Sequence, residues 1–211
     1  MNYSLAFTFV KEEKDWIQKI LVTGLILLIP IVGALYLVGW MFEITRRIAR
    51  HETPVLPEVD FSKYIGIGFK AIVVAFVYML PCTIVSIFSS TTDAILSNSR
   101  SDGIVFLRTV TNCGFGLINF VLWLALSFVL IAAYIRFLDN FQISSAFNFA
   151  AVWKTVTSSA KDILILWLFN LLSGLIASVG LVFCFIGIIF TAPYASAVWG
   201  NLLGQAKEKI G

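Results

Sequence analysis

A long stretch without charge in the C-terminal third limits what this chain can fold into. The 44 residues from Ile163 to Ala206 contain no Asp, Glu, Lys, Arg or His. One unbroken helix of that length, rising about 1.5 Å per residue, would reach about 66 Å, roughly twice the hydrocarbon core of a bilayer. The stretch must therefore turn back. Glycine predicts the turn at Val179–Leu181, and Gly187 offers a second break.

The composition requires lipid to solvate part of the chain. Hydrophobic residues make up 59% of the 211 residues and charged residues only 13%, whereas soluble domains are about 45–50% apolar and about 25% charged. A soluble core of this size cannot bury that much apolar surface. We therefore predict an all-α, polytopic membrane helix bundle with five to six embedded segments and amphipathic interfacial helices. Residues 1–211 would form a single membrane domain.

The first charge-free window, Ile20–Phe42, leaves two arrangements open. It could cross once as a kinked helix, or Pro30 and Gly33 could form the tip of a hairpin that returns to its starting face. A single crossing divides the fifteen Lys and Arg residues ten to five between the two faces, and a hairpin divides them thirteen to two. The positive-inside rule favours the hairpin. A cleaved signal peptide is not expected, because the window is too long for its apolar region.

The middle of the chain predicts two membrane-spanning helices, Ala71–Thr92 with a kink at Pro81, and Thr109–Ile135. Between them, residues 89–108 are rich in Ser, Thr, Asn and Asp and carry only two cations. This segment is predicted to be a polar loop on the outer face.

Three further segments predict amphipathic helices that lie in the membrane interface. They are Tyr3–Val10, Phe61–Phe69, and a helix that runs from a cap at Ser144 or Ser145 to about Thr157.

Internal sequence similarity predicts a parallel repeat of residues 3–50 and 144–206, linked by two spanning helices within 65–138. Each copy would lead into an apolar hairpin from the same face. Chance similarity in a Phe-rich sequence is the alternative. The matched pairs are Ala6–Phe9 with Ala146–Phe149, and Lys14–Ile17 with Lys161–Leu164.

No pattern in the sequence indicates catalysis. The single histidine, His51, cannot form a paired-His metal motif. Cys82, Cys113 and Cys184 lie in apolar segments, and we interpret them as small buried hydrophobic residues. We expect no catalytic residue, no cofactor and no metal, and therefore no enzyme. Without a basic stripe, nucleic acid is not an expected partner.

A cationic cluster on the predicted inner face has two interpretations. It could bind anionic lipid headgroups, or it could only set the topology, and the topology interpretation is favoured because it needs no ligand. The members of the cluster are Arg46, Arg47, Arg50, Lys63 and Lys70.

The last apolar helix carries a stripe of small residues at every fourth position. The stripe predicts close packing, either against a neighbouring helix of the same chain, which is favoured, or against another copy or a partner membrane subunit. Its members are Ala192, Ser196, Gly200 and Gly204.

Asn119 and Asn170 are uncharged polar residues at predicted membrane depth. Interhelical hydrogen bonding is favoured for both over contact with a substrate.

Several short segments in the first third resemble one prokaryotic membrane family, and the resemblance covers most of the chain. They are Asp15–Ile20, Ile29–Gly33, Gly39–Trp40, Arg46–Arg47 and Leu56–Glu58. The family is domain of unknown function four thousand and thirteen. Trp40 and Val59 depart from the Tyr and Trp expected there. The resemblance implies an integral membrane protein and supplies no catalytic residues.

These observations predict a non-enzymatic scaffold, accessory subunit or lipid-interacting component whose partners include membrane lipids. It would lie in the cytoplasmic (inner) membrane of a bacterium or archaeon, with the Arg46–Lys70 loop and the C-terminus in the cytoplasm. The alternative is a transporter or channel for a small or lipophilic solute, which the interrupted segments at Pro30 and Pro81 keep open.

Overall fold

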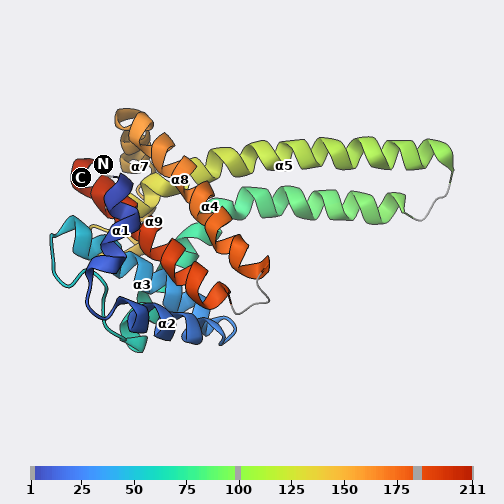
Figure 1. Ribbon diagram of the computed structural model, residues 1–211. Coiled ribbons are helices and arrows are strands. Elements are labelled where there is room, and N and C mark those ends of the chain that lie inside the picture. The colour runs from blue at the N-terminus through green and yellow to red at the C-terminus, as the bar shows by residue number, and fades with distance from the viewer. Residues whose placement is uncertain (1–2, 98–100, 183–186, 211) are drawn as a thin grey trace. The chain divides into compact units, whose positions relative to one another are not determined.

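The computed structural model describes residues 3–97, 101–182 and 187–210, and the regular structure of these residues is helical. Two compact units are distinguished: unit 1, formed by Met1–Val74 and Ile131–Gly211, and unit 2, formed by Ala75–Leu130. Figure 1 shows the path of the chain. The helices are α1 (Tyr3–Glu12), α2 (Trp16–Leu27), α3 (Val32–Ala49), α4 (Phe61–Leu96), α5 (Asp102–Phe137), α6 (Ile143–Ala146), α7 (Phe149–Ser158), α8 (Ala160–Val182) and α9 (Ile188–Ile210).

Helix α9 is the centre of unit 1. It packs against α8, α3, α2 and α1, and its side chains Leu202 and Leu203 are fully buried. At the α1 contact, the Tyr194 hydroxyl donates to the Phe7 carbonyl oxygen at 2.8 Å. The charge-free stretch therefore contributes a central buried helix of this unit, not only a lipid-facing surface.

Helices α2 and α3 form a hairpin that turns at Pro30. Helix α2 ends at Leu27, α3 begins at Val32, and the two helices pack against each other. Proline ends the helix because it lacks an N–H donor and disfavours helical backbone in the residue before it. Gly33 permits the turn, because a Cβ there would overlap the backbone of Leu27. With 12 and 18 residues, the helices are about 18 Å and about 27 Å long, shorter than the roughly 30 Å hydrocarbon core.

Helices α8 and α9 form a second hairpin. The turn predicted at Val179–Leu181 is wrong. Helix α8 continues through these residues to Val182, and α9 begins after Gly187. A helix of 23 residues reaches about 34 Å, so α8 continues for about the thickness of the hydrocarbon core before the chain turns.

The α4 and α5 helices are longer than predicted, with 36 residues each. The break expected after the interfacial helix Phe61–Phe69 is absent, and Pro81 lies inside α4. The polar loop expected over 89–108 is wrong, because the described residues are helical to Leu96 and again from Asp102. Hydroxyl side chains such as Ser90 and Thr92 donate to carbonyl oxygens four residues earlier, which lets a Ser- and Thr-rich segment stay helical.

The starts of α2 and α7 differ in their capping. Helix α2 begins at Trp16, and Asp15 before it makes no side-chain capping hydrogen bond. The cap predicted at Ser144 or Ser145 is wrong, because the Asn148 side chain accepts from the Ala151 amide at 3.2 Å and caps α7. Helices α7 and α8 then meet at an angle of 93°.

Two described helices, α4 and α5, are long and apolar enough to cross a membrane, and a third span results if the bent pair α7–α8 counts as one. Helix α2 is apolar but shorter.

Candidate functional site

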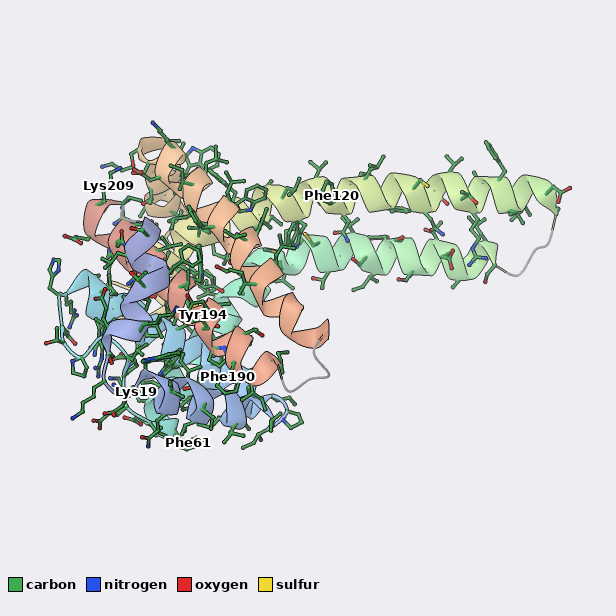
Figure 2. All side chains as sticks on the ribbon, in the orientation of Figure 1. Lys19, Phe61, Phe120, Phe190, Tyr194 and Lys209 are labelled. Carbon is green, nitrogen blue, oxygen red and sulfur yellow. The ribbon has the colours of Figure 1, made fainter. Side chains whose placement is uncertain are left out.

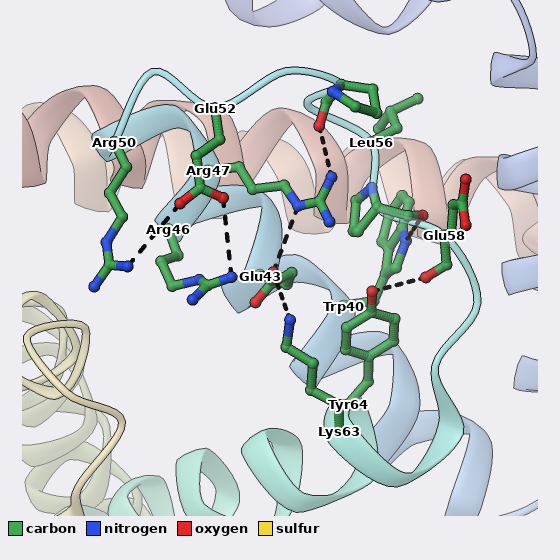
Figure 3. Close-up of polar contacts among 12 residues, drawn as sticks. Trp40, Glu43, Arg46, Arg47, Arg50, Glu52, Leu56, Glu58, Lys63 and Tyr64 are labelled. Atoms are coloured by element: carbon green, nitrogen blue, oxygen red, sulfur yellow. Dashed lines mark hydrogen bonds and ion pairs between the residues drawn. The ribbon is translucent and has the colours of Figure 1, made fainter.

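A buried carboxylate holds three cations together in unit 1. Glu43, in the last two turns of α3, is fully buried. Its Oε1 atom accepts from Arg46 Nη2 at 2.5 Å, from Arg47 Nε at 3.4 Å and from Lys63 Nζ at 2.8 Å. The two arginines follow Glu43 by three and four residues, so the helix itself brings them to the carboxylate. Lys63 comes from the first turn of α4 (Figure 3).

The electrostatics keep Glu43 ionised. Burial by itself would raise the pKa of the Glu43 carboxyl, but hydrogen bonds from Lys63 and Arg46, together with their positive charges, hold this pKa below its usual value. Three cations share one carboxylate, so the cluster keeps a net positive charge. The arrangement is therefore an ion-paired joint between α3 and α4.

The loop between α3 and α4 is held by side chains that donate to its carbonyl oxygens. Arg47 Nη1 donates to Pro54 O at 2.7 Å, and the Tyr64 hydroxyl donates to Glu58 O at 2.7 Å. Both contacts are drawn in Figure 3. Because bonded backbone groups favour one loop conformation, the loop is fixed against the ends of both helices. A cavity of about 320 Å³ lies here, and its lining includes Arg47 and Lys63 together with the acidic loop residues Glu58 and Asp60.

The start of α2 lies beside the same loop. Lys19 Nζ donates to Leu56 O at 2.6 Å and pairs with Glu13 at 3.1 Å. In return, the Glu13 carboxylate accepts from the Leu56 amide at 2.7 Å. The two open ends of the α2–α3 hairpin therefore meet at the same side of unit 1.

The C-terminal end of α9 lies beside the C-terminal end of α3. His51 Nε2 lies 3.2 Å from Glu208 Oε1. Lys207 pairs with Asp139, and Lys209 pairs with Asp162 at 2.7 Å. Asp162 lies in the first turn of α8. A cavity of about 400 Å³ lies at this junction.

The predicted cationic cluster is only partly assembled. Arg46, Arg47 and Lys63 meet at Glu43. Arg50 is more than half exposed, and its nearest acidic partner, Glu52, is 4.0 Å away. Lys70 is exposed on α4 and forms no ion pair with the described residues.

Sequence reasoning missed two cations of this region, Lys19 and Lys207. Their partners, Leu56 and Asp139, are 37 and 68 residues away along the chain. No local spacing could indicate these contacts.

The small residues of α9 lie at the contact with α3. A Cβ atom on Gly204 would lie 2.7 Å from the Ile48 Cβ atom, and one on Gly200 would lie 2.9 Å from the Met41 carbonyl oxygen. Ala192 and Ser196, earlier in the stripe, are half-buried.

The two candidate intramembrane asparagines differ in their surroundings. Asn119 Nδ2, in α5, donates to Ser86 Oγ, in α4, at 2.9 Å, and its Oδ1 atom is buried without a partner among the described residues. Asn170 is exposed on α8. A cavity of about 260 Å³ lies beside Asn119 and is lined by Ser86, Ser89 and Asn112.

The cysteine interpretation is wrong for one residue at least. Cys113 is exposed on α5 and Cys82 is half-buried, because α5 is apolar on faces that the described chain does not cover. Cys184 and the predicted outer cation Arg100 lie outside the described residues. Over the described part of the chain, no group of three or more His, Cys, Asp or Glu side chains could hold a metal ion.

The fold and the site define an all-helical protein with two to three helices that are able to span a membrane. The model of the family described as "Protein of unknown function (DUF4013)" matches residues 22–186, and the chain belongs to this family. No curated protein and no solved structure matches the chain.

Proposed function

We propose that this is a multi-pass protein of a prokaryotic cytoplasmic membrane with a non-enzymatic role, as a scaffold, accessory subunit or lipid-interacting component. This proposal rests on one observation: α4 and α5 expose apolar side chains that no other part of the described chain covers. In the most apolar stretch of both α4 and α5, only 17% of residues are buried. Phe120, on α5, is 57% exposed (Figure 2). Such surface is stable where lipid covers it.

Helix α8 supports the same proposal within unit 1. Its exposed leucines, Leu164, Leu168, Leu171 and Leu175, recur every three or four residues and therefore lie on one face. The opposite face carries the buried Ile163 and Leu166, toward the core. One side of α8 thus packs in unit 1, and the other side is suited to lipid.

The hairpin arrangement explains the charge distribution. Lys19 and Leu56 meet at the open end of the α2–α3 hairpin, and His51 and Glu208 meet where α3 and α9 end. The turn of the hairpin is apolar and exposed, with Ile31 78% exposed. Lipid would cover this tip, and thirteen of the fifteen Lys and Arg residues would lie on the cytoplasmic side.

In this arrangement α2 and α3 enter the membrane without crossing it, whereas α4 and α5 cross. Together with α8 and α9, the embedded segments number five or six. The order of helices supports a parallel repeat, because α1–α3 and α7–α9 each comprise a short helix followed by a helical hairpin.

The non-enzymatic role is supported by how the ionisable side chains are used. Glu43 is surrounded by cations that it holds in place, and an ion pair of this kind stabilises a joint. A general acid or base needs a pKa near the operating pH, whereas the pKa of Glu43 is lowered.

One observation favours transport as the second candidate. The cavity beside Asn119 is lined by Ser and Asn side chains between two lipid-exposed helices, and a polar surface at membrane depth is where a carrier would contact its solute. Uptake of a labelled polar solute into vesicles that contain the purified protein, compared with empty vesicles, tests this alternative.

Cysteine accessibility in whole cells tests the proposed topology. In a chain whose three native cysteines are replaced by Ala, single cysteines are introduced as Lys14→Cys, Arg50→Cys and Asp102→Cys. A membrane-impermeant thiol reagent should label position 102 in intact cells, and positions 14 and 50 only after permeabilisation. Labelling of 14 and 50 from opposite sides would exclude the hairpin. Release of the protein by alkaline carbonate would exclude membrane insertion altogether.

A further inference from the structure

We infer that the cavity of about 400 Å³ at the ends of α3 and α9 binds the phosphate group of an anionic lipid headgroup. This inference rests on the proposed membrane location and names the ligand chemistry of one site. The volume lies in the range of about 300–1,000 Å³ that is typical of ligand sites.

Three cations from two helices line this cavity: Arg46 and Arg50 at the end of α3, and Lys207 in α9. Two carboxylates also line it, Asp139 and Glu208. The lining therefore carries three positive and two negative side chains, and the excess is positive.

Both carboxylates already have cationic or hydrogen-bonding partners. Asp139 pairs with Lys207, and Glu208 lies 3.2 Å from His51. Of the two arginines, Arg50 is the less well satisfied, because Arg46 Nη2 already lies 2.5 Å from Glu43 Oε1. Their common partner Glu52 is 3.9 Å from Arg46 and 4.0 Å from Arg50, and Arg46 shares Glu43 with two other cations. The least compensated charge of the cavity is therefore the Arg50 guanidinium, and a guanidinium binds phosphate oxygens in pairs.

The other loop cavity lacks this excess. Arg47 and Lys63 line the cavity of about 320 Å³ together with Glu58 and Asp60, so two positive charges face two negative charges. A neutral lining gives no net attraction for an anion, and the two cavities differ in this respect.

The lining also explains why the phosphate would belong to a lipid. Ala49 and Leu138 form an apolar part of the wall, and the cavity lies at the ends of helices whose apolar parts are proposed to be embedded. A headgroup at this depth places its acyl chains beside the helices. Positive residues near such a surface attract anionic lipids.

Lipid binding to the full chain in mild detergent tests the inference. Native mass spectrometry would compare phosphatidylglycerol with phosphatidylcholine of the same acyl chains, and soluble glycerol phosphate as a separate arm. The wild-type protein should bind phosphatidylglycerol roughly tenfold or more tightly than phosphatidylcholine. The double variant Arg50→Gln/Lys207→Gln should lose roughly tenfold or more of this affinity, as expected for charge-assisted hydrogen bonds to phosphate.

A matched control removes the same charge elsewhere. Lys70→Gln/Lys209→Gln takes one cation from α4 and one from α9, and neither residue lines the cavity. This control should keep the preference for phosphatidylglycerol within about twofold. A second variant, Ala49→Phe, keeps every charge and fills the cavity, so it should also lose binding. This variant is needed because Lys207→Gln also removes the ion-pair partner of Asp139 and could change folding. Ala49→Phe leaves that ion pair in place.

Equal losses in the double variant and its control would overturn the inference, as would equal binding of the two lipids by the wild type. Binding of glycerol phosphate as tightly as phosphatidylglycerol would overturn the lipid assignment and leave a soluble phosphate ester as the ligand. Carbonate extraction of the same cells keeps the two proposals apart. A chain that stays in the membrane but shows no lipid preference contradicts only the site.

Discussion

Lys63 Nζ, in the first turn of α4, lies 2.8 Å from Oε1 of the fully buried Glu43 in α3. This contact joins two helices that are separated by a loop, and it does so at the end of the charge-free window where α3 leaves the proposed membrane region. A carboxylate without cations would be unstable at this position, because burial disfavours its charge. The ion pair between Glu43 and Lys63 thus stabilises the contact between α3 and α4.

Replacing Glu43 by Gln should destabilise the protein by about 3–5 kcal/mol, because it leaves Arg46, Arg47 and Lys63 around a neutral group. Thermal unfolding in mild detergent measures the effect. Glu52→Gln serves as the control, since Glu52 is 40% exposed and its ion pairs are 3.9 Å and 4.0 Å long. That change should cost less than about 1 kcal/mol. Equal effects of the two substitutions would contradict a special role for Glu43.

Acid should weaken the same joint. The pKa of Glu43 is lower in the folded protein than its usual value, so the folded state binds fewer protons at this site. The resulting stabilisation is complete above the pKa of an unfolded Glu, about 4.3, and is lost as the pH falls through the lowered pKa of the folded state. The melting temperature between pH 7 and pH 3 should therefore fall more steeply for the wild type than for Glu43→Gln. Parallel curves would show that this carboxylate does not contribute to acid sensitivity.

Two glycines in α4 should respond in opposite ways to alanine. A Cβ atom on Gly68 would overlap the Leu35 carbonyl oxygen of α3, whereas a Cβ on Gly66 meets nothing within 4 Å. Gly68→Ala should destabilise by about 1–3 kcal/mol through overpacking. Gly66→Ala should stabilise by about 0.5–1 kcal/mol, because Ala loses less backbone entropy in a helix. The difference in melting temperature between the two variants tests the α3–α4 crossing, and a similar result for both would reject it.

The contact of α9 with α3 gives a further prediction. Gly200→Leu/Gly204→Leu should lower stability, because both glycines face α3 within unit 1. The size of the particle in mild detergent should not change. Light scattering coupled to gel filtration measures that size, and a smaller particle in the variant would assign the stripe to an interface between copies.

Parts of this fold follow from short-range patterns. Pro30 marked the turn before α3, although the pattern alone left a kinked span open. The pairing of Glu43 with Arg46 and Arg47 is local in the same way, because residues three and four apart share a helix face. Segment 89–108 was predicted wrongly from its polarity. An ion pair between Asp93 and Arg108 and a hydrogen bond from Asn112 to Asp93 link α4 to α5 there, so polar residues support two helices instead of a loop.

The sequence by itself determined that this chain is helical and too apolar for water, since hydrophobicity and helix breaks are properties of residues a few positions apart. Only the tertiary structure decided which charges meet when they lie far apart along the chain. Lys63 reaches Glu43 across 20 residues, and Lys207 reaches Asp139 across 68. Such contacts depend on how closely helix backbones approach, and α3 and α4 approach closely where Gly39 lies against the Tyr64 carbonyl and Gly68 against that of Leu35. The physical reason is steric: the absence of two side chains sets this distance, and the distance sets the ion pairs.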